Sequence, residues 1–172
     1  MPISSLLIRN EKLEDAAVIT ELTAAAFATL AVSDHTEQYV ILALRKAAAL
    51  TVSLVADMEG GVVGHIAFSP VMISDGTPGW YGLGPVSVQP ELQQQGIGTA
   101  LIETGLARLR ELGAHGCCLV GHPDYYPRFG FRNTADLNVA GVPPEVFFAL
   151  SFDGHTPHGV VTFHEGFGAT GE

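Results

Sequence analysis

Cysteine is scarce in this sequence, since only two of the 172 residues are cysteine. Cys117 and Cys118 are neighbours within an apolar run, and on a strand their side chains would point to opposite faces. We therefore expect two small buried hydrophobic residues, and a scaffold held together by disulfide bonds is excluded. This composition favours the reducing cytoplasm as the compartment.

Basic residues are also few, with 8 lysines and arginines against 18 aspartates and glutamates, a net charge of −10. This balance argues against a nucleic-acid partner, because phosphates are bound by a basic face. It is compatible with a cationic small molecule such as an amine. Solubility alone would also account for most of an acidic surface.

The sequence has no hydrophobic run long enough to cross a membrane, although 47% of its residues are hydrophobic. The short apolar run at residues 3–8 follows no basic region and precedes no clear cleavage site, so no secretory signal is predicted. We expect a single domain over residues 1–172, because this length suits one core and no internal repeat or linker divides it.

Residues 83–101 form the most informative stretch of the chain. Val86, Ser87 and Val88 alternate as in a strand, and Pro90 ends that strand because proline cannot donate to a ladder. Gly96-Ile97-Gly98 then leads into an amphipathic helix. Glycines placed before the free N–H groups of a first helical turn allow a phosphate to bind there. The alternative interpretation of the same glycines is a tight turn without a ligand. Neither the dinucleotide-binding pattern nor the Walker pattern is present.

The periodicity along the chain predicts an α/β protein in which strands and helices alternate. The strand before the helix at 98–112 and the strand after it are expected to be parallel, because a long helix connects them. We expect strands at residues 5–10, 51–58, 62–73, 80–89, 116–121, from 131, 145–152 and 159–164, and helices at 14–30, 37–49, 98–112 and 125–129.

The loop Gln93-Gln94-Gln95-Gly96-Ile97-Gly98 resembles the Arg/Gln-x-x-Gly-x-Gly/Ala loop of the GNAT superfamily of acyl-CoA-dependent N-acyltransferases. The segments at 64–71, 125–131 and 143–148 resemble the YhbS-like subgroup of that family. The resemblance implies the GNAT fold: a central mixed, mostly antiparallel sheet with a splayed parallel strand pair and helices on both faces. It also implies transfer of an acetyl group from acetyl-CoA to a primary amine of a small molecule or peptide, by direct attack in a ternary complex.

The resemblance further implies which residues bind the coenzyme. The backbone of the central strand would hold the pantetheine arm, the N–H of Val88 would stabilise the oxyanion, and the glycine loop would hold the diphosphate. The residues carried over are Val86, Ser87, Val88, Gln93, Gln94, Gln95, Gly96, Ile97, Gly98 and Thr99.

The pattern Tyr-x-x-x-Gly-Phe resembles the family's general-acid motif and assigns Tyr126 to protonate the CoA thiolate, whereas Tyr125 is expected to pack. The general base is left open between His65 and His122, although a structural or surface histidine is the favoured interpretation of each. The tail histidines have no metal-site spacing, so no metal is expected.

Two other function classes remain open. A non-catalytic acyl-CoA-binding or sensor module is favoured by the lack of a carboxylate in residues 80–88, where many relatives carry the base. A structural domain that binds a ribosome or protein is disfavoured by the acidity and by the intact glycine loop. A homodimer is possible, with Phe147 and Phe148 in a late strand facing a partner.

Overall fold

The computed structural model describes residues 5–31 and 33–171. Its long helices are α1 (Ala16–Phe27), α2 (Glu37–Lys46) and α3 (Ile97–Glu111). Its strands are β1 (Leu6–Asn10), β2 (Val52–Met58), β3 (Gly61–Ile73), β4 (Trp80–Val88), β5 (Gly116–Val120), β6 (Leu137–Asn138), β7 (Phe147–Ser151) and β8 (Gly159–Phe163). None of the helices within these residues is long and apolar enough to cross a membrane.

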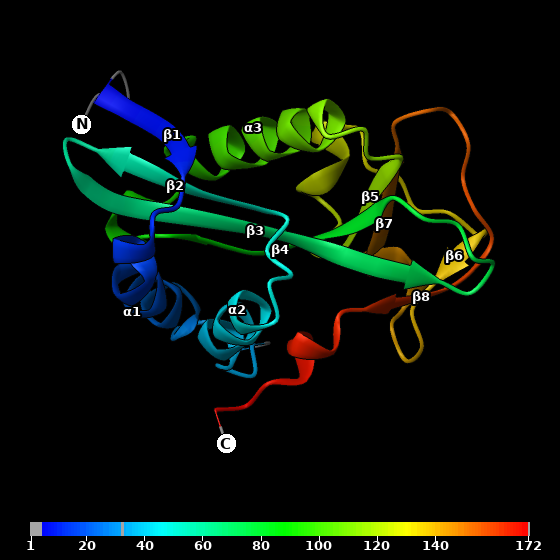
Figure 1. Cartoon of the computed structure of the whole chain (residues 1–172), viewed down its shortest axis with the longest axis horizontal. Helices are drawn as coiled ribbons and strands as arrows, with labels where there is room; N and C mark the ends of the chain where they lie inside the picture. The colour runs from blue at the N-terminus through cyan, green and yellow to red at the C-terminus, as the bar shows by residue number, and fades with distance from the viewer. Residues whose placement is uncertain (1–4, 32, 172) are drawn as a thin grey trace.

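The strands form one mixed sheet in the order β1-β2-β3-β4-β5-β7, with β8 added to the end of β3 (Figure 1). Along this path β4 and β5 are parallel and every other pair is antiparallel. The short β6 runs parallel to β8. This arrangement confirms the predicted mixed, mostly antiparallel α/β fold.

Helix α3 covers one face of the sheet, and α1 and α2 cover the other (Figure 1). The main core lies under α3, where Leu101 and Leu109 pack against residues of β2, β3 and β5. Gly105 lets this helix approach closely, because a Cβ there would overlap the ring of Phe68. Cys117 belongs to this core and Cys118 to a second one near β8, so the two thiols lie on opposite faces as predicted.

Strand β3 changes its partner at Pro70. It pairs with β2 as far as Phe68 and with β8 from Val71 onward. Pro70 pairs only with β4, through Tyr81, so its missing N–H costs no bond to a second neighbour. Pro70 therefore marks the place where β2 and β8 divide one long edge of β3 between them.

Four predicted elements differ clearly from the structure, and the first is the helix expected at 14–30, which as α1 spans only Ala16–Phe27. No strand begins at Phe131, since only an isolated bridge joins Arg132 to Ala149 and the next strand is β6. The strand expected from residue 145 starts at Phe147, because Pro144 opens a turn of 3-10 helix instead. Helix α2 ends at Lys46, three residues earlier than predicted, and Ala48 has a left-handed backbone with φ 56°.

Phe147 and Phe148 do not face a partner subunit. Each is 2% exposed and packs into a core of its own chain, so the sequence-based interpretation of these two rings was wrong. Their hydrophobicity stabilises β7 within the sheet.

Candidate functional site

The sheet opens between β4 and β5. These strands pair only at Trp80–Gly82 of β4 and Gly116–Cys118 of β5. Beyond this point β4 continues to Val88 beside β3, while β5 continues to Val120 beside β7. The carboxyl half of β4 therefore has no β5 partner, as expected for a splayed parallel pair.

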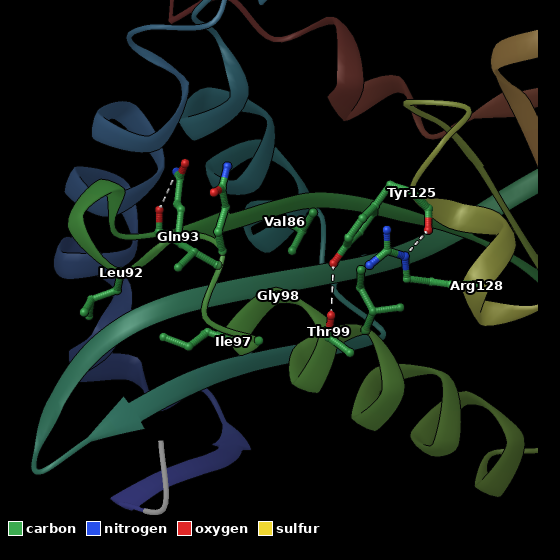
Figure 2. A pocket seen from close by; sticks show the side chains of 12 residues that line it. Val86, Leu92, Gln93, Ile97, Gly98, Thr99, Tyr125 and Arg128 are labelled. Carbon is green, nitrogen blue, oxygen red and sulfur yellow. Dashed lines mark hydrogen bonds between the residues drawn. The ribbon is translucent and has the colours of Figure 1, made fainter. Parts of the chain in front are cut away.

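A cavity of about 620 Å³ lies at this opening, next to the start of α3 (Figure 2). We call it the β4–α3 cavity. It is lined by Val86, Val88, Leu92, Gln93, Gln94, Gly96, Ile97, Gly98, Thr99, Ile102, Tyr125 and Arg128. Eight of the ten residues that the sequence assigned to the coenzyme are therefore brought together here, all except Ser87 and Gln95.

Ser87 and Gln95 lie outside the cavity lining for different reasons. Ser87 is buried and donates a hydrogen bond to Thr23 Oγ1 of α1 at 3.4 Å, so its side chain lies on the face opposite α3. Val86 and Val88, on either side of it, pack on the α3 face and reach the cavity. Gln95 is exposed at the outer side of the loop.

The main chain at the start of α3 turns its N–H groups toward this space. Gln94 and Gly96 have left-handed backbones, with φ 64° and 91°, and the helix begins at Ile97. The N–H of Ala100 is bonded to Gly96 O at 3.0 Å. The preceding first-turn N–H groups have no partner within the helix. A Cβ at Gly98 would be in ordinary van der Waals contact, 3.5 Å from the Tyr125 hydroxyl, so a side chain longer than that of alanine would occupy the space before these N–H groups.

The backbone of Val88 also points toward the opening. The N–H of Gln89 donates to Val63 O on β3, at 2.8 Å. Because successive N–H groups of a strand point to opposite sides, the N–H of Val88 points away from β3. Its carbonyl accepts a hydrogen bond from Gln93 Nε2 at 3.1 Å (Figure 2).

Arg128 is the one charged side chain among the lining residues of this cavity. Its guanidinium lies 4.5 Å from the centroid of the Tyr125 ring, and its Nε donates to Tyr125 O at 2.9 Å. The Tyr125 hydroxyl lies 3.4 Å from Thr99 Oγ1, so the tyrosine bridges the short helix and α3 (Figure 2). Although the net charge of the chain is −10, the described residues that line this cavity include no carboxylate and one cation, which suits an anionic ligand.

Tyr126 lines a different cavity, of about 460 Å³, which shares Val86 with the first. We call it the aromatic cavity, after the rings of Phe27, Tyr126, Phe163 and Phe167 that line it. The Tyr126 ring packs edge to face on Phe131 with centroids 6.1 Å apart. Burial raises the pKa of Tyr126 to about 12, so the phenol stays protonated and can donate.

Neither candidate histidine lines either cavity. His65 is fully buried between β2 and β4, with Nε2 2.8 Å from Ser53 Oγ and 3.6 Å from Glu11 Oε1. Burial lowers its pKa, which keeps the ring neutral. His122 is 71% exposed at the carboxyl end of β5, where Nδ1 accepts from the N–H of Asp124. The role of either histidine as the general base therefore stays a prediction.

The tail histidines take part in local contacts. His158 Nδ1 lies 3.2 Å from Asp136 Oδ1, and His164 Nδ1 accepts from the N–H of Gly166. Over residues 5–31 and 33–171, no group of three or more His, Cys, Asp or Glu side chains could hold a metal ion.

Comparisons with known proteins agree with this geometry. The acetyltransferase (GNAT) domain matches residues 50–133. The N-acetyltransferase YhbS of Escherichia coli K12 is 34% identical over 171 residues, covering 94% of this chain and 98% of that protein.

Two solved structures are also similar. A GNAT family acetyltransferase from Brucella melitensis in complex with acetyl-CoA is 48% identical, with a TM-score of 0.85 over 94% of this chain and 97% of that one. YhbS from Escherichia coli in complex with CoA is 31% identical, with a TM-score of 0.86 over 99% and 96%. These findings confirm the resemblance read from the glycine loop: the chain belongs to the GNAT family of acetyltransferases.

Proposed function

We propose that this acetyltransferase binds acetyl-CoA along the β4–α3 cavity and transfers the acetyl group to a primary amine bound on the other side of Val86. The observation that carries the proposal is the opening between β4 and β5 beside the unpaired first turn of α3. An extended thioester arm can enter such an opening and bond to the free edge of β4, as a further strand would.

The diphosphate of the coenzyme is held by the main chain in this proposal. The first-turn N–H groups of Ile97, Gly98 and Thr99 supply donors, and the α3 dipole favours negative charge at this end. Arg128 supplies the cation that the family places at the first loop position, where this chain has Gln93. The Gln93 side chain instead donates a hydrogen bond to the carbonyl of Val88, which holds the loop against β4.

In this proposal the chemical step takes place beside Val86, where the two cavities meet. The nitrogen of the neutral amine attacks the thioester carbonyl carbon, and the N–H of Val88 donates to the oxygen as negative charge develops. The carbon–sulfur bond then breaks and the thiolate takes a proton from Tyr126, while the new amide nitrogen loses one proton to solvent and the Tyr126 phenolate takes one back from solvent. Solvent is the proton acceptor in this proposal: no histidine within the described residues lines either cavity, and Asp34 and Glu37 of the second cavity are the carboxylates that could relay the proton.

A non-catalytic acyl-CoA-binding module remains the second candidate, supported by the absence of a carboxylate along β4. One experiment separates the two. Calorimetry with CoA measures binding, and release of free thiol in the presence of a panel of primary amines measures turnover. We expect both signals. Tight CoA binding without amine acetylation would instead favour the binding module, and absence of CoA binding would overturn both.

We also propose that the protein works in the cytoplasm, because its two cysteines are free and buried, and that no nucleic acid is its partner, because its charge is strongly acidic.

A further inference from the structure

The aromatic cavity is built from parts of the chain that are far apart in the sequence. Its four rings come from α1, the short helix at Tyr126–Phe129, β8 and the 3-10 helix at Glu165–Gly168. The last of these lies beside α2 (Figure 1). A cavity of about 460 Å³ falls within the range of roughly 300–1,000 Å³ that is typical of small-molecule sites.

The charged side chains that line the aromatic cavity are acidic. Asp34 and Glu37, at the start of α2, are the two charged side chains among the residues that line the cavity. Glu37 is held in place by Ser33 Oγ, which lies 2.8 and 2.7 Å from its two carboxylate oxygens. No lysine or arginine of the described chain lines this space, so a ligand carboxylate would find repulsion and no cation.

The cavity also adjoins the place of reaction. Tyr126, the proposed general acid, lines this cavity and not the first, and Val86 lines both. The amine attacks the same carbonyl carbon that the thiolate leaves. Since the acid that protonates the thiolate lines the aromatic cavity, we expect the amine to approach this carbon from that cavity.

We propose that the acceptor is a small primary amine on an aromatic or branched apolar body, without a carboxylate, and that it binds in the aromatic cavity. This inference rests on the proposed function. The four rings bury the apolar body, and removal of its apolar surface from water favours binding. The two carboxylates attract the ammonium form of the ligand and repel an amino acid of the same shape. A polyamine would lose hydration at its further ammonium groups without filling the apolar walls.

The test compares amines that differ by one feature at a time, at saturating acetyl-CoA. 2-Phenylethylamine has the ring and the amine, phenylalanine adds a carboxylate to the same skeleton, and 1,4-diaminobutane lacks the ring. We expect kcat/KM for 2-phenylethylamine to exceed both others by at least about tenfold, which corresponds to about 1.4 kcal/mol. A higher kcat/KM for phenylalanine or for the diamine would overturn the inference and leave the acetyltransferase proposal intact.

Variants of residues that line the aromatic cavity test whether these residues determine the selectivity between amines. The double variant Asp34→Asn/Glu37→Gln should reduce the discrimination between 2-phenylethylamine and phenylalanine about tenfold. Phe163→Ala should raise KM for 2-phenylethylamine more than KM for 1,4-diaminobutane. Glu103→Gln, an exposed carboxylate of α3 on the opposite face of the sheet, is the matched control.

Binding of CoA by each variant, measured by calorimetry, separates the possible failures. Unchanged CoA affinity together with unchanged discrimination in the double variant would overturn the role of the carboxylates. If CoA binds and no amine is acetylated, the proposed function fails and this inference fails with it.

Discussion

Tyr125 and Tyr126 are neighbours in the sequence, yet their side chains line two different cavities. Their rings meet edge to face, with centroids 5.1 Å apart and an interplanar angle of 85°. Tyr125 lies over the start of α3, whereas Tyr126 packs between Gly121 and the rings of Phe131 and Phe148. This pair forms part of the boundary between the proposed coenzyme side and the proposed acceptor side. Replacing either tyrosine by phenylalanine removes the same hydroxyl group, yet the two replacements are expected to have different effects.

Loss of the Tyr126 hydroxyl should slow the chemical step. Tyr126→Phe keeps the ring and its packing but removes the proposed donor to the thiolate, so we expect kcat to fall about 10²-fold or more, with KM for acetyl-CoA little changed. Steady-state kinetics of thiol release measures both constants. Tyr125→Phe is the control and should leave kcat within a few-fold. A similar loss of kcat in both variants would contradict the assignment of the acid.

The pH profile gives an independent check on Tyr126. The general acid must be protonated, and burial raises its pKa to about 12, so its ionisation should not reduce kcat at any pH up to about 10. We expect kcat of the native enzyme to show no alkaline decline over this range. A decline with an apparent pKa of 9–10 that disappears in Tyr126→Phe would show a phenol exposed to water, against the burial described above.

A larger side chain at Gly98 should prevent coenzyme binding without unfolding the protein. A Cβ at this position would lie at ordinary contact distances, 3.5 Å from the Tyr125 hydroxyl and 3.8 Å from Val88 Cγ2, and the backbone there is helical. Gly98→Ala should therefore fold normally and bind CoA somewhat more weakly. Gly98→Leu should fill the space before the first-turn N–H groups and weaken binding at least about 100-fold, measured by calorimetry.

Thermal unfolding supplies the control for this series, because Gly98→Leu should melt within a few degrees of the native protein. If Gly98→Leu bound CoA as tightly as the native chain does, the main-chain amides at the start of α3 would not be the diphosphate site.

The resemblance of one continuous stretch was enough to predict most of the β4–α3 cavity. The strand ending at Val88, the glycine loop and α3 are consecutive, so the likeness of this stretch to the GNAT loop implied eight of the residues that line the cavity. Tyr125 was expected only to pack, and Arg128 was interpreted as a solvated surface charge in preference to a contact with the CoA phosphates. Both reach this cavity from the short helix after β5, and proximity in space leaves no trace in local periodicity. The motif assigned different roles to the two adjacent tyrosines, but it did not predict that Tyr125 lines the β4–α3 cavity.

Long-range pairing was the part that the sequence did not reveal. The addition of β8 to the end of β3 brings Phe163 to the aromatic cavity, and nothing in either strand's pattern specifies that register. His65 illustrates the same limit. Its residue type and its strand suggested a base, but α1, α2 and the sheet bury it in a cluster with Glu11 and Ser53.

Removal of the Arg128 charge should weaken coenzyme binding by electrostatics. Arg128 is the one cation among the residues lining the β4–α3 cavity, and an exposed guanidinium near a diphosphate interacts less strongly as salt increases. We expect Arg128→Gln to raise the Kd for CoA about tenfold at low ionic strength and less at 0.5 M salt. Arg132→Gln is the matched control, because Arg132 bonds to the carbonyls of Pro127 and Phe131 and does not line the cavity. Equal effects of the two variants would indicate a general charge effect.

The buried His65 should make the fold sensitive to mild acid. Burial lowers its pKa below the ordinary value of about 6.5, so the folded chain keeps the ring neutral while the unfolded chain takes up a proton. The unfolded state therefore binds more protons below about pH 6.5, and the free energy of unfolding should decrease as pH falls through this region. Glu11 affects the free energy of unfolding at lower pH. Burial alone would raise its pKa, but hydrogen bonds from His65, Arg45 and Ser53 outweigh this and lower it to about 2, so its contribution is lost only between about pH 4.5 and 2.

Urea unfolding between pH 7.5 and 5.5 isolates the histidine, because Glu11 stays ionised in both states over this range. We expect His65→Gln to be less stable than the native protein at pH 7.5, but to lose less stability on acidification. His122→Gln replaces a histidine that is exposed to water in the folded chain and should retain the native dependence on pH. A native free energy of unfolding that is independent of pH over this range, or a decrease that His65→Gln leaves unchanged, would contradict a neutral buried imidazole at the centre of the sheet.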